Sequence, residues 1–184
     1  MNPRYQAGFA KPLVNQLIAI LQRDQQAALD IVNATRPQDR ALPPFKAFHK
    51  EVSPVQNWPA LVLVAQEISF DAASDSDLRT QSLRFIAAMA ISNTDPDWLV
   101  EDAMDYLRAV DTVLTSAPLA DFYAPLAISH RTVPSGETAG LDATTAKIQD
   151  LRVVRHDLGA VVARRGGSVA RGPQIEFVVE LEEK

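Results

Sequence analysis

The chain has 184 residues, about the length of one domain, and its composition (47% hydrophobic, 22% charged) is that of a globular protein. Its 18 basic and 23 acidic residues give a net charge of −5, which argues against specific nucleic-acid binding, because gripping phosphates needs an excess of positive charge. The lack of cysteine excludes disulfides, thiolate metal sites and cysteine nucleophiles. No apolar run reaches the roughly 18–20 residues that span a bilayer, and no signal peptide is evident. We therefore expect no membrane partner and assembly in the cytoplasm.

The first 34 residues are predicted to form an N-terminal helix that ends near Asn33. Apolar residues recur at spacings of three, four and seven from Leu13 to Ile31 and Val32, and Pro12 is tolerated in a first turn. Residues 35–59 follow as a proline-rich arm, with five prolines, at positions 37, 43, 44, 54 and 59. That density excludes a long helix or a central strand. Interleaved anchors predict that the arm is ordered and extended, with a disordered linker as the alternative: Phe45, Phe48, Val52 and Trp58.

Residues 60–117 are predicted to form a hairpin followed by a helix. The segment LVLVAQEISF at 61–70 and the alternation from Leu83 to Ile91 each indicate a strand, joined by a turn-rich loop. Asp95 and Pro96 are a favoured N-cap and first helical residue. The buried stripe of this helix is expected to contain Leu99, Val100, Ala103, Leu107, Val110 and Leu114.

The remaining chain is predicted to contain a long excursion at 118–149 and a C-terminal hairpin at 150–184. The hairpin's first strand is irregular near His156–Gly159, which suggests a bulge. Its second strand has the clearest alternation in the chain, with Ile175, Phe177, Val179 and Leu181 on one face. Between them lies the flexible, arginine-bearing loop ARRGGSVARG.

Taken together, residues 1–184 are expected to form a single α+β domain. Two consecutive hairpins around a packed helix predict a mainly antiparallel sheet of about four strands with flanking helices and the long proline-rich arm.

No catalytic or metal site is predicted. His49, His130 and His156 show no metal-ligand spacing, and HExxH, GxSxG and phosphate-loop motifs are absent. His156 and Asp157 are adjacent on a strand, so their side chains should point to opposite faces rather than form a base and its orienting acid. Three loop acids lack the spacing of a calcium loop and favour a solvated loop: Asp71, Asp75 and Asp77. We therefore expect a protein that is not an enzyme and has no cofactor or metal.

Charge is segregated along the chain, and this feature predicts an assembly interface. Residues 95–111 carry six acids and one base, whereas residues 151–172 carry five arginines and one acid. Such segregation can steer the association of surfaces, although neutralisation within one chain explains it equally well. The proposed interface residues are Arg164, Arg165 and Arg171 on the loop, and Glu101, Asp102 and Asp105 on the helix. A phosphate bound by the three arginines is a further alternative.

The element order resembles that of the tail terminator (tail completion) proteins of tailed bacteriophages. The resemblance rests on an N-terminal helix, a strand opening with Trp58-Pro59-Ala60-Leu61-Val62-Leu63-Val64, the helix DPDWLVEDAMDYLRAVDTVL, and the hairpin VVRHDLGAVVARRGGSVARGPQIEFVVELEE. It spans roughly residues 10–33, 58–117 and 150–183, and depends on pattern because the family has no diagnostic residue motif.

The resemblance implies a structural virion subunit that forms a homo-oligomeric ring, expected to be a hexamer, at the head-proximal end of a tail. It would cap polymerisation of the tail tube and contact the tail tube protein and the neck or head-joining proteins. The alternatives are another neck, baseplate or head–tail joining protein, and a small phosphate- or ligand-binding regulatory domain. An enzyme is the third rival.

Overall fold

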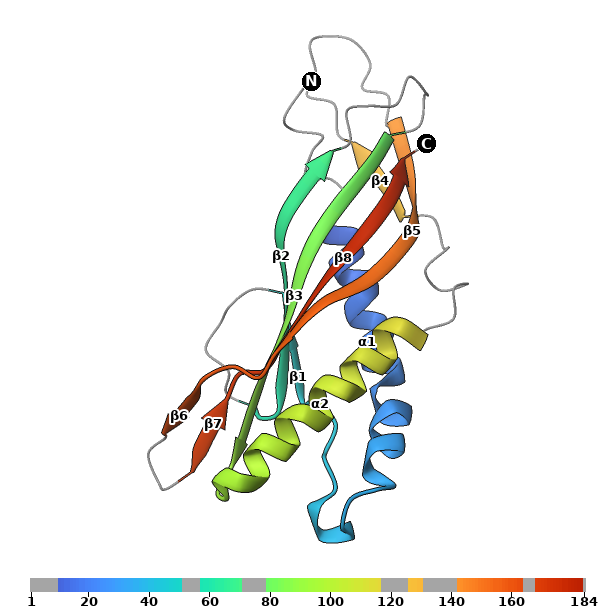
Figure 1. Cartoon of the computed structure of the whole chain (residues 1–184). Helices are drawn as coiled ribbons and strands as arrows, with labels where there is room; N and C mark the ends of the chain where they lie inside the picture. Colours follow the sequence, from blue (N-terminus) through green and yellow to red (C-terminus); the bar gives the residue numbers. More distant parts are fainter. Residues whose placement is uncertain are drawn as a thin grey trace.

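The computed structural model describes residues 10–50, 57–70, 79–116, 126–130, 142–163 and 168–183. These residues form an α+β fold, in which a mixed sheet of eight strands packs against two helices (Figure 1). The main path of the sheet runs β1-β2-β3-β8-β5-β4, while β7 pairs with β3 and β6. The strands are β1 (Ala47–His49), β2 (Ala60–Phe70), β3 (Arg79–Asn93), β4 (Leu126–His130), β5 (Asp142–Asp157), β6 (Val161–Ala163), β7 (Val169–Arg171) and β8 (Gln174–Glu183).

The predicted α+β class is confirmed, but the sheet has more strands than the four expected. β1 lies in the predicted arm and pairs in parallel with β2, whereas the other pairings are antiparallel. β4 and the start of β5 lie in the predicted excursion. These strands were missed because the segments are rich in proline, threonine and alanine and show little period-two alternation.

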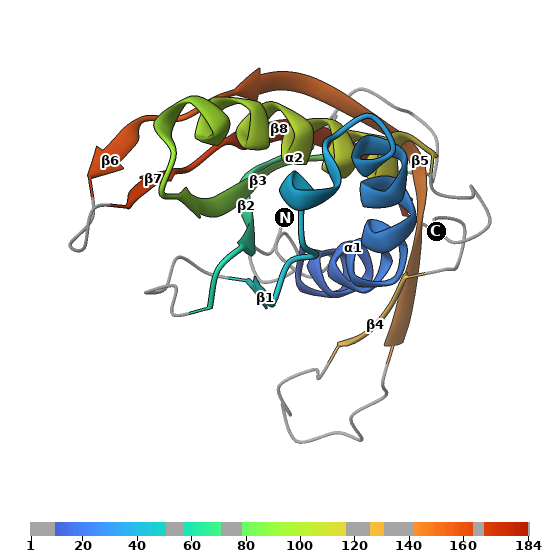
Figure 2. The ribbon, with the colours of Figure 1, turned by 90° about the horizontal axis from the view of Figure 1, so that it is seen from below.

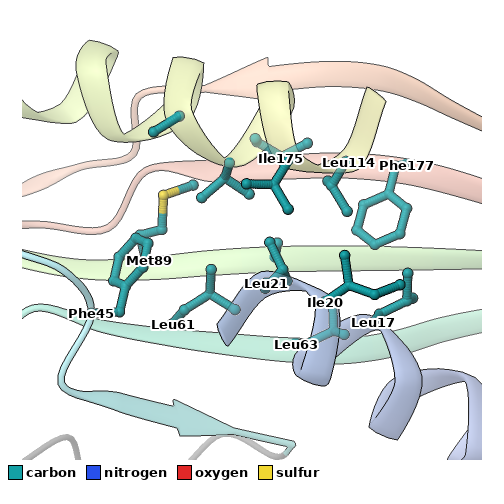
Figure 3. Packing of buried hydrophobic residues seen from close by; sticks show 14 of the residues in the cluster. Leu17, Ile20, Leu21, Phe45, Leu61, Leu63, Met89, Leu114, Ile175 and Phe177 are labelled. Carbon is teal, nitrogen blue, oxygen red and sulfur yellow. The ribbon is translucent and has the colours of Figure 1, made fainter. Parts of the chain in front are cut away.

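One face of the sheet supplies the core. Alternate residues of β8 are fully buried, as predicted: Ile175, Phe177, Val179 and Leu181. They lie opposite inward residues of β3, so that Phe177 pairs with Phe85 and their rings stack at 5.4 Å. Figure 3 shows Ile175 and Phe177 directed toward leucines of the two helices. In Figure 2 the sheet curves around both helices, which therefore share its inner side.

Both helices form where they were predicted. In each of them, one residue that was expected in the buried stripe is exposed. α1 (Ala10–Asn33) has Pro12 in its first turn, but Ile31 is 61% exposed. α2 (Pro96–Ser116) begins at an Asp95 cap, whose carboxylate accepts hydrogen bonds from the backbone N–H groups of Asp97 (3.1 Å) and Trp98 (3.5 Å). Val100, expected in the core, is exposed.

The segment predicted as an ordered, extended arm packs onto the domain. A short 3₁₀ turn (Gln38–Arg40) leads to Leu42, whose backbone N–H donates to Asn33 Oδ1 at 2.8 Å. Phe45 is buried, and its N–H donates to Gln25 Oε1 at 2.8 Å. Two side chains of α1 therefore satisfy backbone groups that the prolines leave without a regular partner. Residues 51–56, including the predicted anchor Val52, lie outside the described residues.

The C-terminal hairpin bends where β5 and β8 continue into β6 and β7. The strand irregularities lie at 149 and 154, earlier than the predicted bulge at His156–Gly159. Gly159 itself has φ +69°, and a Cβ there would collide with the carbonyl oxygen of Gly172. Beyond this crossing, the β6–β7 hairpin projects from the body of the domain (Figure 1). The expected flexible loop is therefore partly an ordered hairpin.

Replacing Phe177 with alanine is expected to destabilise the fold by about 3–5 kcal/mol, because it opens a cavity against Phe85 at the centre of the sheet. Urea unfolding followed by circular dichroism measures this change. Val162→Ala on β6, where the side chain is 59% exposed, is the control and should shift stability by less than about 0.5 kcal/mol. Equal effects of the two substitutions would show that β8 is not central to the core.

Candidate assembly surfaces

Arg36 lies at the centre of a polar cluster that joins the end of α1 to α2. Its side chain is only 5% exposed, and its two terminal nitrogens form ion pairs with Asp102 Oδ1 and Asp105 Oδ2. Its Nε donates to the carbonyl oxygen of Arg40 at 2.8 Å. The second oxygen of Asp102 accepts a hydrogen bond from Asn93 Nδ2 at 2.7 Å. Every strong contact of the guanidinium is thus made within one chain, which is how a buried charge is tolerated.

The predicted interface must be revised, because two of the three acids assigned to it pair with Arg36. Asp102 and Asp105 were expected to meet arginines of a neighbouring subunit, but they bind Arg36 of the same chain. One positive charge of the same chain therefore offsets part of their negative charge, and Arg36 lies outside the basic segment 151–172. Glu101 is exposed and remains a candidate contact.

Aromatic side chains close the cluster on two sides. The guanidinium carbons of Arg36 and Arg40 lie 5.4 Å and 5.0 Å from the centre of the Trp98 ring, a cation–π arrangement. The hydroxyl of Tyr106 donates to the carbonyl oxygen of Pro43 at 2.7 Å. Burial, and then the charge of Asp102, raise the pKa of Tyr106, so the hydroxyl stays protonated as a hydrogen-bond donor.

A cleft of about 410 Å³ lies beside the cluster, between the 39–46 segment and the ends of β2 and β3. Its lining mixes cations and acids with aromatic rings, including Arg40, Lys46, Asp39, Trp58 and Tyr106. Asp102, which also borders it, is held by Arg36 and Asn93. Among the described side chains of the cleft, no hydrogen bond joins a nucleophile to a base.

The basic half of the predicted interface is only partly visible. Arg164 and Arg165 lie outside the described residues. Arg171 lies on β7, where its Nε donates to the carbonyl oxygen of Gly159 at 3.2 Å. Arg171 therefore helps to hold the β6–β7 hairpin at its crossing point, rather than extending freely from a loop tip.

Large apolar side chains are exposed mainly on two segments of the described structure. Five of the six large exposed ones lie on α2 or on the β5–β6 segment: Val100, Met104, Val154, Val161 and Val162. Val100 and Met104 are one turn apart, and Asp111, seven residues after Met104, lies 3.9 Å from His156 of β5. This side of α2 therefore faces β5. We call Val100 and Met104 the α2 strip. Neighbouring exposed apolar side chains on a helix are candidates for a protein–protein contact.

The candidate chemical residues do not assemble into a site in the described part of the chain. His156 approaches Asp111, whereas Asp157 pairs with Arg155 at 2.9 Å, so the adjacent side chains diverge as predicted. No group of three or more potential metal ligands occurs among the described residues, and Asp71, Asp75 and Asp77 lie outside them. Within those same residues, no helix combines the length and apolar character needed to cross a membrane.

Two features were not predicted from the sequence: the ion pairs of Arg36 and the exposed valines of β6. Arg36 was counted as part of the proline-rich arm. Its two partners lie 66 and 69 residues away in the sequence, so no local pattern indicated the pairing. Val161 and Val162 were treated as the end of a strand. The sequence did contain a signal, because these two β-branched residues are adjacent, between Gly159 and the arginines. Neighbouring strand residues point to opposite faces, so at least one of the two valines must point away from a core on one face.

Comparisons with known proteins give likenesses in structure, among them one to a chain of a virion. No protein-family model matches the chain, and no curated protein matches it. A chain of the "Virion of native gene transfer agent (GTA) particle" is similar in structure, with a TM-score of 0.42 and 15% sequence identity. The likeness covers 85% of this chain and 93% of that chain. We draw no functional conclusion from a likeness of this degree.

Arg36→Met is expected to destabilise the protein by about 3–5 kcal/mol, because it leaves Asp102 and Asp105 without their buried counter-charge. Arg40→Met is the matched control. Its partner Asp95 is 3.9 Å away and both side chains are more than a third exposed, so the cost should stay below about 1 kcal/mol. Thermal and urea unfolding measure both changes.

A triple variant distinguishes lost charge pairing from lost packing. Adding Asp102→Asn and Asp105→Asn to Arg36→Met removes the unpaired charges and should restore part of the stability. If the triple variant is less stable than Arg36→Met alone, the ion-pair explanation is wrong.

Proposed function

We propose that this chain is a structural subunit of a phage-type virion, a tail terminator that forms a ring at the head-proximal end of the tail. In this role it would cap polymerisation of the tail tube and join the tail to the neck. Its partners would be further copies of itself, most simply six in a ring, together with the tail tube protein and the neck proteins. Assembly would take place in the host cytoplasm, and no catalysis is required of it.

The exposed apolar side chains of α2 and the β5–β6 segment carry this proposal. In a domain that acts alone, these five side chains would stay in contact with water. In contrast, an assembling subunit buries them against a neighbour. The resemblance in element order supplies the setting, and the order of α1, β2, β3, α2 and the C-terminal hairpin agrees with it.

The α2 strip is the proposed contact between copies. Val100 and Met104 supply the apolar area, and Glu101 adjoins them on the exposed side of the helix. Glu101 is the member of the predicted acidic set that Arg36 does not bind. In the proposed ring, it meets an arginine of the neighbouring copy. An exposed ion pair at the margin of an apolar contact makes association sensitive to salt.

Light scattering during size-exclusion chromatography tests this proposal. The purified chain is expected to have a mass several times its 20.1 kDa at low salt and a smaller mass at high salt. Met104→Glu should lower the mass at low salt, because it places a charge in the apolar contact. Ile31→Glu introduces the same charge at an exposed position on α1 and should leave the mass unchanged.

A parent protein that stays at 20.1 kDa over a wide concentration range would refute the ring. Equal effects of Met104→Glu and Ile31→Glu would leave the ring in place but remove the α2 strip as its contact.

A further inference from the structure

The β6–β7 hairpin has an open strand edge outside the main sheet. β6 pairs with β7 on one side, and no described strand pairs with its other side. All three residues of β6, Val161 to Ala163, are exposed. The backbone N–H and C=O groups along this edge are therefore available to an added strand, which is how extended segments bind to sheets.

Both faces of β6 are apolar. Val161 and Val162 are adjacent, so they point to opposite faces, and they are 53% and 59% exposed. β7 lies between β6 and the end of β3, so β6 is the edge of three paired strands, and an added strand would cover part of each valine. β-Branched residues are also the preferred neighbours of a paired strand.

The hairpin is held in a fixed direction by contacts at its base. Gly159 and Gly172 cross too closely for a side chain, Arg171 bonds to the carbonyl oxygen of Gly159, and the N–H of Met89 donates to the carbonyl oxygen of Pro173 at 2.8 Å. β7 is in addition paired with the end of β3 through residues 91–93. An edge that is already ordered loses little conformational entropy when a strand binds.

Charge identifies the chemistry of the added strand. Residues 158–173 contain three arginines and no acidic residue. An incoming segment with carboxylates would be attracted, and one with lysines or arginines repelled. Pairing of β6 with β6 of a second copy would place the arginine-bearing hairpins side by side, which like-charge repulsion opposes.

The other described edge strands of this chain are also unsuitable partners. β1 is flanked by Lys46 and Lys50, and β4 (Leu126–His130) contains no acid. β8, whose sequence is acidic, lies inside the sheet between β3 and β5. The outer edges of β2 beyond Val62 and of β5 beyond Ala146 also have no described partner strand. The acid on this part of β2, Glu67, lies 3.9 Å from Arg84, and this part of β5 carries more basic than acidic residues. A second copy therefore offers, among its described residues, no strand edge with more than one acid in excess.

We propose that the edge of β6 binds an extended acidic segment of a different protein by strand addition, with apolar residues of that segment covering Val161 and Val162. In the tail setting, this protein would be a neighbouring subunit of the particle. The inference does not depend on ring formation, because it concerns β6 rather than the α2 strip.

A peptide probe tests the proposal on the full chain. The probe is a fluorescein-labelled, eight-residue peptide in which glutamate and valine alternate, and the comparison peptide alternates lysine and valine. The acidic peptide should bind about tenfold or more tightly than the basic one, as judged by fluorescence anisotropy at low salt. In amide NMR spectra, the acidic peptide should shift Val161–Ala163 and slow their hydrogen exchange.

Substitutions at β6 separate strand addition from general charge attraction. Val161→Thr with Val162→Thr keeps the β-branched shape and should weaken binding about tenfold. Val162→Glu should weaken it further by repelling the peptide. Ile31→Thr, at an equally exposed position on α1, should change nothing. Met104→Glu should also bind normally, which separates this site from the proposed ring contact.

Three results would overturn the proposal. The first is equal or absent binding of the two peptides, and the second is a map of amide shifts away from β6. The third is that the double threonine variant changes the mass of the free protein while Met104→Glu does not, since β6 would then pair between copies of this chain.

Discussion

The fold depends on the position of its last strand. β8 lies between β3 and β5, so the final segment of the chain completes both halves of the sheet. Its inward side chains, from Ile175 to Leu181, form one core cluster with side chains of the two helices. Without β8, neither the β2–β3 pair nor the β4–β5 pair has a central partner, and both helices lose the surface against which they pack. We therefore expect the sheet to require β8.

The same constraint produces the projecting hairpin. β5 and β8 are long enough to run past the body of the domain, and the crossing at Gly159 and Gly172 turns their continuation into β6 and β7. Val169 of β7 packs against the core, whereas the apolar residues of β6, Val161 and Val162, remain exposed. At the opposite side of α2, Arg36 fastens the helix to the end of α1. One side of α2 is thus fixed internally, while the other side carries the strip proposed to contact a neighbour.

Sequence reasoning succeeded where local pattern and final environment agree. The alternation of Ile175, Phe177, Val179 and Leu181 predicted their burial, and Asp95 with Pro96 predicted the start of α2. It failed where distant residues decide the outcome. Asp102 and Asp105 have the pattern of a solvated acidic face, and only their pairing with Arg36 shows otherwise. Likewise, the 35–59 segment has the composition of an arm, because the side chains of Asn33 and Gln25 that hold it come from another element.

The most direct test of the central claim, that the α2 strip is an assembly surface, is amide hydrogen exchange. It is measured on the assembled protein at low salt and on the dissociated protein at high salt. The account predicts that exchange slows on assembly in the part of α2 around Val100 and Met104, with the Arg36 cluster and the exposed end of α1 around Ile31 unchanged. Slower exchange around Ile31, with α2 unchanged, would contradict it.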